Sequence, residues 1–301
     1  MSYYSRLNKS FEGAPRLPLN NRTKYVLISD CHRGVGSSND NFLKNQNLYF
    51  AALQHYYRLG YTYIELGDGD ELWENTKIEQ IIKIHSDVFC LLSHFYNCGR
   101  LYMLYGNHDM VKKDAGYVSN NFSDWPLCEN NPHLHKQPLL PNLKFYEGII
   151  LENTCSPDSM NIYLTHGHQT DLFNSSLWKF SRFLVRYLWK PLEKYGVLDP
   201  TSAAKNYTRQ NKTERRLHHW AEHEKHILIT GHTHRPRLLN DDPYYYNSGS
   251  CVHRFCITCL EIEHMHFRLV KWMLATRTDL SLYVSREVMA ENDLNSQCIL
   301  A

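Results

Sequence analysis

Short apolar runs alternate with polar, glycine-containing segments through the first third of the chain. Residues 41–59 and 77–98 carry apolar positions at helical spacing, and Gly60 and Gly99 follow them as helix stops. The runs before and after these helices are rich in β-branched and aromatic residues, which predicts buried strands at 24–29 (KYVLIS), 61–66 (YTYIEL) and 100–105 (RLYMLY). Alternation of strands and helices with short connections predicts a parallel sheet with right-handed crossovers.

The pattern is less regular in the rest of the chain. Residues 114–142 are rich in Asn, Pro, Asp and Ser and predict a long loop, whereas residues 171–224 are helical in pattern. We expect a hairpin over 143–153, strands at 161–165 and 226–230, and further strands between 243 and 272 that pair in a second sheet.

These patterns divide the chain into an arm, one domain and a tail. We predict a polar N-terminal arm at 1–22, a domain at 23–285 that contains the helical insertion 171–224, and a peripheral C-terminal tail at 286–301. No internal repeat interrupts this organisation.

Composition limits the class of protein. Apolar residues make up 43% of the 301 residues, which is enough for a sizeable core, and the net charge of +2 gives no reason to expect a nucleic-acid-binding module. The N-terminus lacks the apolar core of a secretory signal, and no stretch of eighteen apolar residues predicts a membrane span. We therefore expect a cytoplasmic protein whose nine cysteines are reduced. Cys256 and Cys259 have C-x-x-C spacing but no second pair, which favours alternate positions on a strand.

Potential metal ligands follow each of five predicted strands. In open α/β sheets, ligands bind beyond the carboxyl ends of the strands, so these side chains should gather at one edge. They are Asp30 and His32, Asp68, Asn107 with His108 and Asp109, His166 and His168, and His232 and His234.

The residue types also suit one chemistry. Imidazole, carboxylate and amide oxygen are ligands of Zn, Mn or Fe. Two such divalent ions can clamp a phosphoryl group and lower the pKa of a shared water, and a bridging carboxylate is needed because two bare dications repel each other. In the pattern D-x-H both side chains point to the same side of an extended strand end.

The five segments SDCHRG, GDGDELW, GNHD, THGH and GHTHRP, in this order, resemble the signatures of calcineurin-like metallophosphoesterases. The resemblance extends over about residues 24–272. It implies an α/β fold of two facing mixed β-sheets flanked by helices, with 171–224 as a helical cap insertion. It also implies two divalent metal ions, one held by Asp30, His32, Asp68 and His234 and the other by Asp68, Asn107, His166 and His232.

The resemblance further assigns the chemistry. His108 would protonate the leaving oxygen or stabilise developing charge, and Asp109 would orient His108. A hydroxide between the metals would attack phosphorus in a phosphodiester, pyrophosphate or phosphomonoester. The alternatives are a serine/threonine protein phosphatase and a non-catalytic scaffold with the same fold.

Several neighbouring residues are candidates for other roles. Arg33 could bind a substrate phosphate bidentately, or lie at the surface, and His168 could contact the site. We expect Asp70 at the rim of the site and Glu71 and Trp73 as braces of the next loop.

Residues 172–196 are amphipathic and suggest what the substrate is. Between Trp178 and Arg216 there are ten Lys or Arg and three acids, so these helices could attract an anionic, phosphorylated small-molecule or lipid-linked substrate, or simply present a solvated face. Their apolar side could also make a peripheral membrane contact. The layout resembles the UDP-2,3-diacylglucosamine hydrolase branch, although that branch has Arg at the position of His108. His219 and His223, four residues apart, are either an extra metal pair or an exposed helix face.

Overall fold

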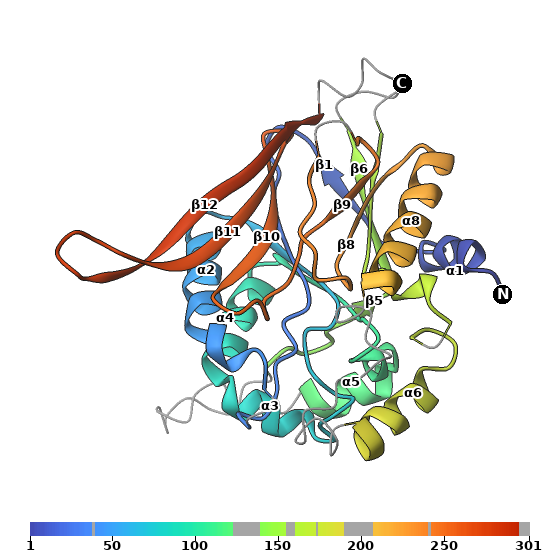
Figure 1. Cartoon of the computed structure of the whole chain (residues 1–301), viewed down its shortest axis with the longest axis horizontal. Helices are drawn as coiled ribbons and strands as arrows, with labels where there is room; N and C mark the ends of the chain where they lie inside the picture. Colours follow the sequence, from blue (N-terminus) through green and yellow to red (C-terminus); the bar gives the residue numbers. More distant parts are fainter. Residues whose placement is uncertain are drawn as a thin grey trace.

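Two β-sheets face each other in the computed structural model, and helices cover their outer sides (Figure 1). The structure describes residues 1–37, 40–122, 139–154, 160–172, 174–189, 207–239 and 242–294, without the side chains of 188 and 189. Both sheets are mixed, because each contains parallel and antiparallel neighbours. The predicted fold class, an α/β sandwich of two mixed sheets flanked by helices, is confirmed.

The larger sheet has seven strands in the order β12-β11-β10-β2-β3-β4-β5. Its parallel half is built from the first predicted strands, and an antiparallel half from the C-terminal region pairs with it through β2 and β10. The strands are β2 (Lys24–Ile28), β3 (Thr62–Leu66), β4 (Leu101–Leu104), β5 (Phe145–Tyr146), β10 (Cys256–Glu263), β11 (His266–Thr276) and β12 (Leu282–Asp293).

The smaller sheet has five strands in the order β1-β6-β7-β8-β9. Only β6 and β7 are antiparallel neighbours; the other pairs are parallel. The strands are β1 (Arg16–Leu19), β6 (Gly148–Asn153), β7 (Ile162–Thr165), β8 (Ile227–Thr230) and β9 (Tyr245–Asn247).

Alternating side chains of each strand enter different apolar layers. Leu27 of β2 packs between the sheets, whereas Val26 and Ile28 pack under the helices of the larger sheet. In the same way, Ile227 lies between the sheets and Leu228 lies under the helices of the smaller sheet. The core is therefore three stacked apolar layers in which the strands are buried on both faces.

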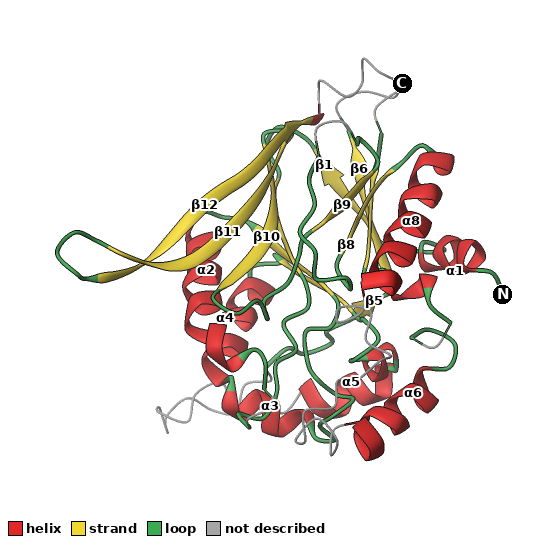
Figure 2. Cartoon of the chain, in the orientation of Figure 1, coloured by secondary structure: helices red, strands yellow, loops and turns green. Residues whose placement is uncertain are grey.

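The helices form the two outer layers, as Figure 2 shows with α2 and α4 beside the larger sheet and α1 and α8 beside the smaller. The α-helices are α1 (Tyr3–Ser10), α2 (Gln46–Arg58), α3 (Ile78–Ile84), α4 (Ser86–Asn97), α5 (Ala115–Phe122), α6 (Trp178–Leu184) and α8 (Tyr207–Glu224). Short helical turns are η1 (Leu43–Asn45), η2 (Met110–Lys113), η3 (His168–Thr170) and the π-helical η4 (Val185–Trp189).

Three predictions about elements are wrong. The single helix expected over 77–98 is two helices, because the buried His85 leaves helical geometry and its ring contacts Gln46 and the carbonyl of Gly34. The hairpin expected over 143–153 does not form, since β5 and β6 belong to different sheets. The loop expected over 114–142 contains α5, and its residues 123–138 lie outside the described part.

The two ends of the chain also differ from the prediction. Residues 1–22 are not a separate arm, because α1 packs beside α8 and β1 pairs with β6, with Leu17 and Leu19 buried between the sheets. Residues 286–293 are not a tail but part of β12, which pairs with β11 along its length. Alternating apolar residues in RLPL were the signal for the first strand.

The predicted insertion 171–224 divides into two parts with different positions. Helix α8 packs on the smaller sheet through Leu217, Trp220 and Ala221, so it belongs to the outer layer. Helix α6 instead contributes Trp178 to a cluster with Trp73. Among the described helices, none is long and apolar enough to cross a membrane.

Candidate metal centre

The predicted ligands gather where strands of both sheets end. Asp30 follows β2, Asp68 follows β3 and Asn107 follows β4 in the larger sheet, while His166 follows β7 and His232 follows β8 in the smaller sheet. The two sheets face each other, so residues far apart in sequence reach one region. The predicted convergence of five strand ends is therefore present, although it draws on both sheets and not on one edge.

The backbone at these strand ends is strained. A non-glycine residue with positive φ is uncommon, because its Cβ crowds the neighbouring peptide. Of the ten such residues in the described part of the chain, five are predicted ligands. Their φ angles are 53° at Asp30, 50° at His32, 51° at Asp68, 67° at His232 and 57° at His234. Strain that clusters in this way is typical of functional sites.

Glycines let the strand ends approach closely. A Cβ on Gly106 would lie 2.2 Å from Oδ1 of Asp68, and a Cβ on Gly231 would lie 2.4 Å from Oδ2 of Asp30. Both contacts are shorter than any real Cβ contact. The glycines before Asn107 and His232 are therefore required for the carboxylates to lie where they do.

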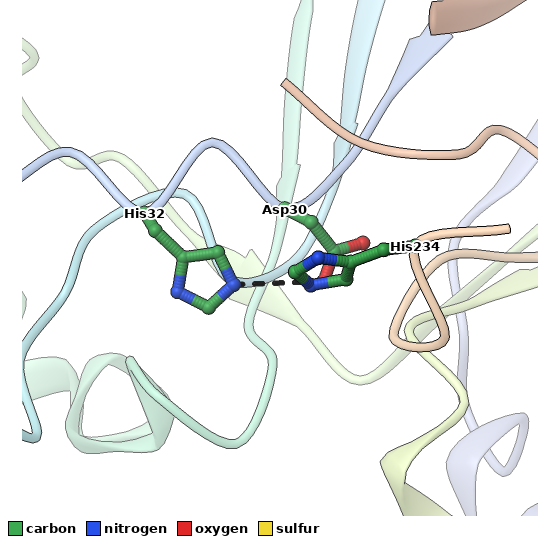
Figure 3. A group of neighbouring side chains, drawn as sticks. All are labelled: Asp30, His32 and His234. Atoms are coloured by element: carbon green, nitrogen blue, oxygen red, sulfur yellow. Dashed lines mark ion pairs between the residues drawn. The ribbon is translucent and has the colours of Figure 1, made fainter. Parts of the chain in front are cut away.

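Asp30, His32 and His234 form the first cluster (Figure 3). Oδ1 of Asp30 lies 3.0 Å from Nε2 of His234 and 3.8 Å from Nε2 of His32. The other oxygen of Asp30 accepts the backbone N–H of His232 at 2.9 Å, which fixes the carboxylate.

Asp68, His166 and His232 form the second cluster. Oδ2 of Asp68 lies 3.1 Å from Nε2 of His166 and 3.8 Å from Nε2 of His32, so this oxygen faces both clusters. Oδ1 of Asp68 accepts the backbone N–H of His108 at 2.8 Å. Asp68 thus occupies the position expected of a bridging carboxylate.

The ligand atoms themselves are buried without hydrogen bonds. Buried polar atoms normally have partners, since an unsatisfied one costs about 1–3 kcal/mol. Within the described residues, nine buried side-chain N or O atoms have none, and five of them belong to predicted ligands. These five are Oδ1 of Asp30, Nε2 of His32, Oδ1 of Asn107, Nε2 of His166 and Nε2 of His232. Oxygen and imidazole nitrogen donors of this kind fit divalent transition metals, so the donor set matches the implied metal ions.

Hydrogen bonds fix the orientation of two histidine rings. Nδ1 of His166 lies 2.9 Å from the carbonyl of Leu66, and Nδ1 of His32 lies 2.9 Å from Oε2 of Glu71. Because both acceptors require Nδ1–H, each ring carries its lone pair on Nε2, which faces the site, once it has lost a proton.

Charges in the site shift the pKa values of its members. Burial opposes ionisation of Asp30, but the rings of His234 and His166 hold its pKa well below the usual range. Burial likewise lowers the pKa of His166, yet Asp68 and Asp30 outweigh it and raise that pKa to about 9. Burial and the charge of His166 lower the pKa of His232 to about 3. Carboxylates here stay ionised at neutral pH, as metal ligands must.

His108 lies beside the clusters and is partly exposed. The centre of its ring is 4.7 Å from that of His32, and 24% of its side chain is exposed. Glu71 binds Nδ1 of His108 at 2.9 Å, and the indole of Trp73 stacks on the ring at 4.4 Å. His234, with 19% of its side chain exposed, is the other predicted site residue that solvent reaches readily.

Asp109 does not orient His108. Its carboxylate accepts backbone N–H groups from Gly106 and Gly69 and pairs with Nζ of Lys112 at 2.7 Å. Consecutive residues point in different directions, so the carboxylate next in sequence faces away. Glu71 holds His108 instead. The carboxylate of Glu71 contacts Nδ1 of both His108 and His32, so it holds two predicted functional residues. Sequence reasoning gave Glu71 only a bracing role; its carboxylate does accept the backbone N–H groups of Trp73 and Glu74 as well.

Arg33 and Asp70 are buried, not at the surface or the rim. The guanidinium of Arg33 is fully buried and binds both oxygens of Glu65, at 2.8 and 2.9 Å, and Oδ1 of Asp70 at 2.7 Å. Asp70 also pairs with Nζ of Lys112 at 2.6 Å. With its donors engaged, Arg33 is not available to a substrate phosphate.

The remaining candidates lie away from the ligand clusters or at their edge. His168 is buried, with its ring 5.5 Å from that of His166, and its Nδ1 lacks a hydrogen bond; burial lowers its pKa well below the usual value. His219 and His223 lie on α8, and among the described residues they belong to no group of side chains that could hold a metal ion. Cys256 and Cys259 both lie in strand β10.

Comparisons with known proteins add little to this picture. No family model matches the chain, and a search of curated proteins found no match. Among solved structures, Vps29 of Chaetomium thermophilum has a TM-score of 0.38 at 9% identity, covering 90% of this chain and 98% of its own. A point mutant of a cold-active protein tyrosine phosphatase has a TM-score of 0.39 at 14% identity, covering 91% and 83%. Likenesses of this size do not bear on function.

Proposed function

We propose that the chain is a metal-dependent phosphoesterase of the calcineurin-like type. One observation carries the proposal: five buried ligand atoms without hydrogen bonds, delivered by the ends of β2, β4, β7 and β8, gather beside the end of β3, which carries Asp68. Such a cluster of unsatisfied groups is costly unless a cation completes it.

The ligand assignment combines the two clusters with Asn107, whose Oδ1 is buried without a hydrogen bond. Asp30, His32 and His234 would hold one divalent cation, His166, His232 and Asn107 a second, and Asp68 both. Two cations bound there would supply Lewis-acid activation of water and neutralise charge on a phosphoryl group. Mn, Fe and Zn all suit these ligands.

His108 supplies the proton chemistry in this proposal. Burial alone would lower its pKa, but Glu71 and Asp68 raise it, which favours the protonated ring. With Nδ1 engaged by Glu71, the proton at Nε2 is available to the leaving oxygen of a phosphate ester. The partial exposure of His108 and His234 supports entry of the substrate from their side of the site.

The substrate class stays a prediction. A phosphorylated small molecule or lipid-linked diphosphate is consistent with the basic residues of α6 and α8, and Phe180 and Phe183 of α6 are exposed, as a peripheral membrane contact through 172–196 would need. Residues 190–196 of that segment lie outside the described part.

A substrate panel tests the proposal. Bis(p-nitrophenyl) phosphate, p-nitrophenyl phosphate, a UDP-sugar and a phosphoserine peptide would be offered to protein loaded with Mn²⁺, Fe²⁺ or Zn²⁺, with the His108→Ala variant as control for contaminating phosphatases. We expect EDTA-sensitive hydrolysis of a small ester or diphosphate, lost in the variant. Preference for the phosphopeptide would favour the protein phosphatase. Bound metal without hydrolysis of any substrate would favour the scaffold and contradict the proposal.

A further inference from the structure

Arg186 of η4 holds a backbone segment more than a hundred residues away in sequence. Its Nε donates to the carbonyl of Trp73 at 2.9 Å, and its Nη2 donates to the carbonyl of Leu72 at 2.8 Å. The planar guanidinium presents these donors in a fixed fork, so it fixes the two adjacent peptide groups relative to each other.

The segment that Arg186 holds is the one that holds His108. Glu71 binds Nδ1 of His108, and the Trp73 indole stacks on the same ring with an interplanar angle of 24°. Glu71 and Trp73 lie on either side of Leu72, so a shift of this backbone would move both contacts.

Apolar packing joins the same two segments independently. Trp178 and Val185, from α6 and η4, are buried in one cluster with Trp73, Tyr105 and Met110. Tyr105 and Met110 in turn flank the GNHD segment in sequence. The 178–186 segment is therefore in contact with the residues on both sides of His108 and with its stacking partner.

We propose that Arg186 is a positioning residue, through which the 178–186 segment fixes the Glu71–Trp73 backbone and thereby the ring of His108. The part of this inference that concerns catalysis rests on the proposed function, because it predicts that a displaced His108 ring lowers kcat. The positional part does not, since it concerns the geometry of His108 in the protein with or without substrate.

The first test is the Arg186→Gln variant of the Mn²⁺-loaded protein. A positioning residue of this kind typically contributes about 10-fold or more, so we expect kcat to fall about 10-fold with KM and Mn²⁺ affinity unchanged. The matched control is Arg58→Gln, which removes the same guanidinium from an exposed position of α2 and should leave kcat unchanged. If Arg186 instead bound the anionic substrate, the variant would have a higher KM and an unchanged kcat, and this result would overturn the proposal.

A double variant asks whether the effect passes through His108. In a His108→Ala background, Arg186→Gln should have almost no further effect, because the ring that it positions is gone. A full additional 10-fold loss in that background would contradict the proposal.

A test without turnover separates this inference from the proposed function. The ring protons of His108 should be shifted upfield by the current of the stacked indole. In ¹H NMR spectra of the metal-free protein, Arg186→Gln should move them toward ordinary values. His226, stacked on Tyr163 at 4.2 Å, should stay unchanged as an internal reference. Unmoved His108 signals would overturn the proposal even in an active enzyme, and moved signals would support it even if no substrate were hydrolysed.

Loss of folding in Arg186→Gln would be seen as a collapse of the His226 shift. Arg186→Lys then serves in its place, because it keeps the charge and the stem but loses the two-pronged geometry. Moved His108 signals with an intact His226 shift would support the proposal, and wild-type His108 signals would overturn it.

Discussion

Asp68 and Asp70 are two residues apart in one loop, and both are buried, but their surroundings are opposite. Asp70 belongs to a network of ion pairs at 2.6–2.8 Å, in which the carboxylates are Glu65, Asp70 and Asp109 and the cations are Arg33 and Lys112. Asp68 lies 3.1 Å from Nε2 of His166 and 3.8 Å from Nε2 of His32, two buried nitrogens without hydrogen bonds. The carboxylates around Asp70 are paired with Arg33 and Lys112, whereas in the proposed function the cluster around Asp68 binds a cation from outside.

The comparison shows that residue type alone does not mark a site. A buried carboxylate that is paired with cations of the chain supports the structure, because removing one partner leaves a buried charge without compensation. A buried carboxylate beside other ligand atoms that lack hydrogen bonds is arranged to bind a cation. Each prediction below tests one side of this contrast.

The largest effect is expected from Asp68→Asn. The amide keeps the volume but cannot serve two cations, so we expect hydrolysis in the panel above to fall by about 1,000-fold or more, equivalent to about 4 kcal/mol of transition-state stabilisation. Steady-state kinetics at saturating Mn²⁺ measures it. A variant within tenfold of wild type would mean that Asp68 is not the bridge.

His108→Ala should have the next largest effect on turnover. Loss of the proton donor typically costs 10²–10⁴-fold, and we expect a fall of about 100-fold in kcat. Manganese content, measured by elemental analysis, should stay at the wild-type value because the ring is not a proposed ligand. Loss of metal together with activity would move His108 into the ligand set.

Asp70→Asn should act on stability and not on chemistry. Breaking a buried pair costs about 3 kcal/mol or more, since the charge of Lys112 or Arg33 loses a partner, and urea unfolding measures the change. At conditions where the variant is folded, kcat should be close to that of wild type. A native-like midpoint with impaired kcat would reverse the roles that we assign to the two aspartates.

The ion pairs of Asp70 also predict how the free energy of unfolding changes at acid pH. Burial opposes ionisation, but Arg33 and Lys112 lower the pKa of Asp70 to about 2. A depressed carboxyl pKa contributes stability above its unfolded value of about 4, and this is lost as pH falls from about 4 to about 2. The difference in unfolding free energy between wild type and Asp70→Asn should therefore shrink over that range. A constant difference would contradict the pairing.

The smallest effect concerns the pH dependence of metal binding. Asp68 and Asp30 raise the pKa of His166 to about 9 against the opposing effect of burial, so a cation must displace a proton from this ring at neutral pH. Affinity for Mn²⁺ should rise with pH, by up to about tenfold per unit for one displaced proton, and level off above about 9. Titrations at pH 6.5, 7.5 and 8.5 measure it. Equal affinity at all three would contradict a metal at His166.

Much of this site could be predicted from sequence because the ligands follow recognisable strands. The pattern of an apolar run, a glycine and then Asp, Asn or His placed Asp68, Asn107 and His232 correctly at strand ends. What holds these residues was not predictable in the same way, because the partners come from other elements. Glu71 contacts His32 and His108 across 39 and 37 residues of sequence.

The sequence also contains a signal for the buried partner of Arg33. Glu65 is a charged residue inside the apolar strand YIEL, and such a residue needs a buried partner. That requirement points to a nearby cation, and Arg33 is the one that meets it. The assignment of Arg33 to substrate was wrong because the local motif did not reveal this competing carboxylate. Similarly, the position of α6 beside Trp73 depends on long-range packing, which no local pattern encodes.

Calorimetric titration of metal-free protein with Mn²⁺ tests the central claim most directly. Wild type, Asp68→Asn and Asp70→Asn would be compared at equal concentrations of folded protein. We predict two bound equivalents for wild type and Asp70→Asn, and loss of tight binding for Asp68→Asn. Binding by Asp68→Asn equal to that of wild type, or no binding by wild type, would contradict a metal centre built around Asp68.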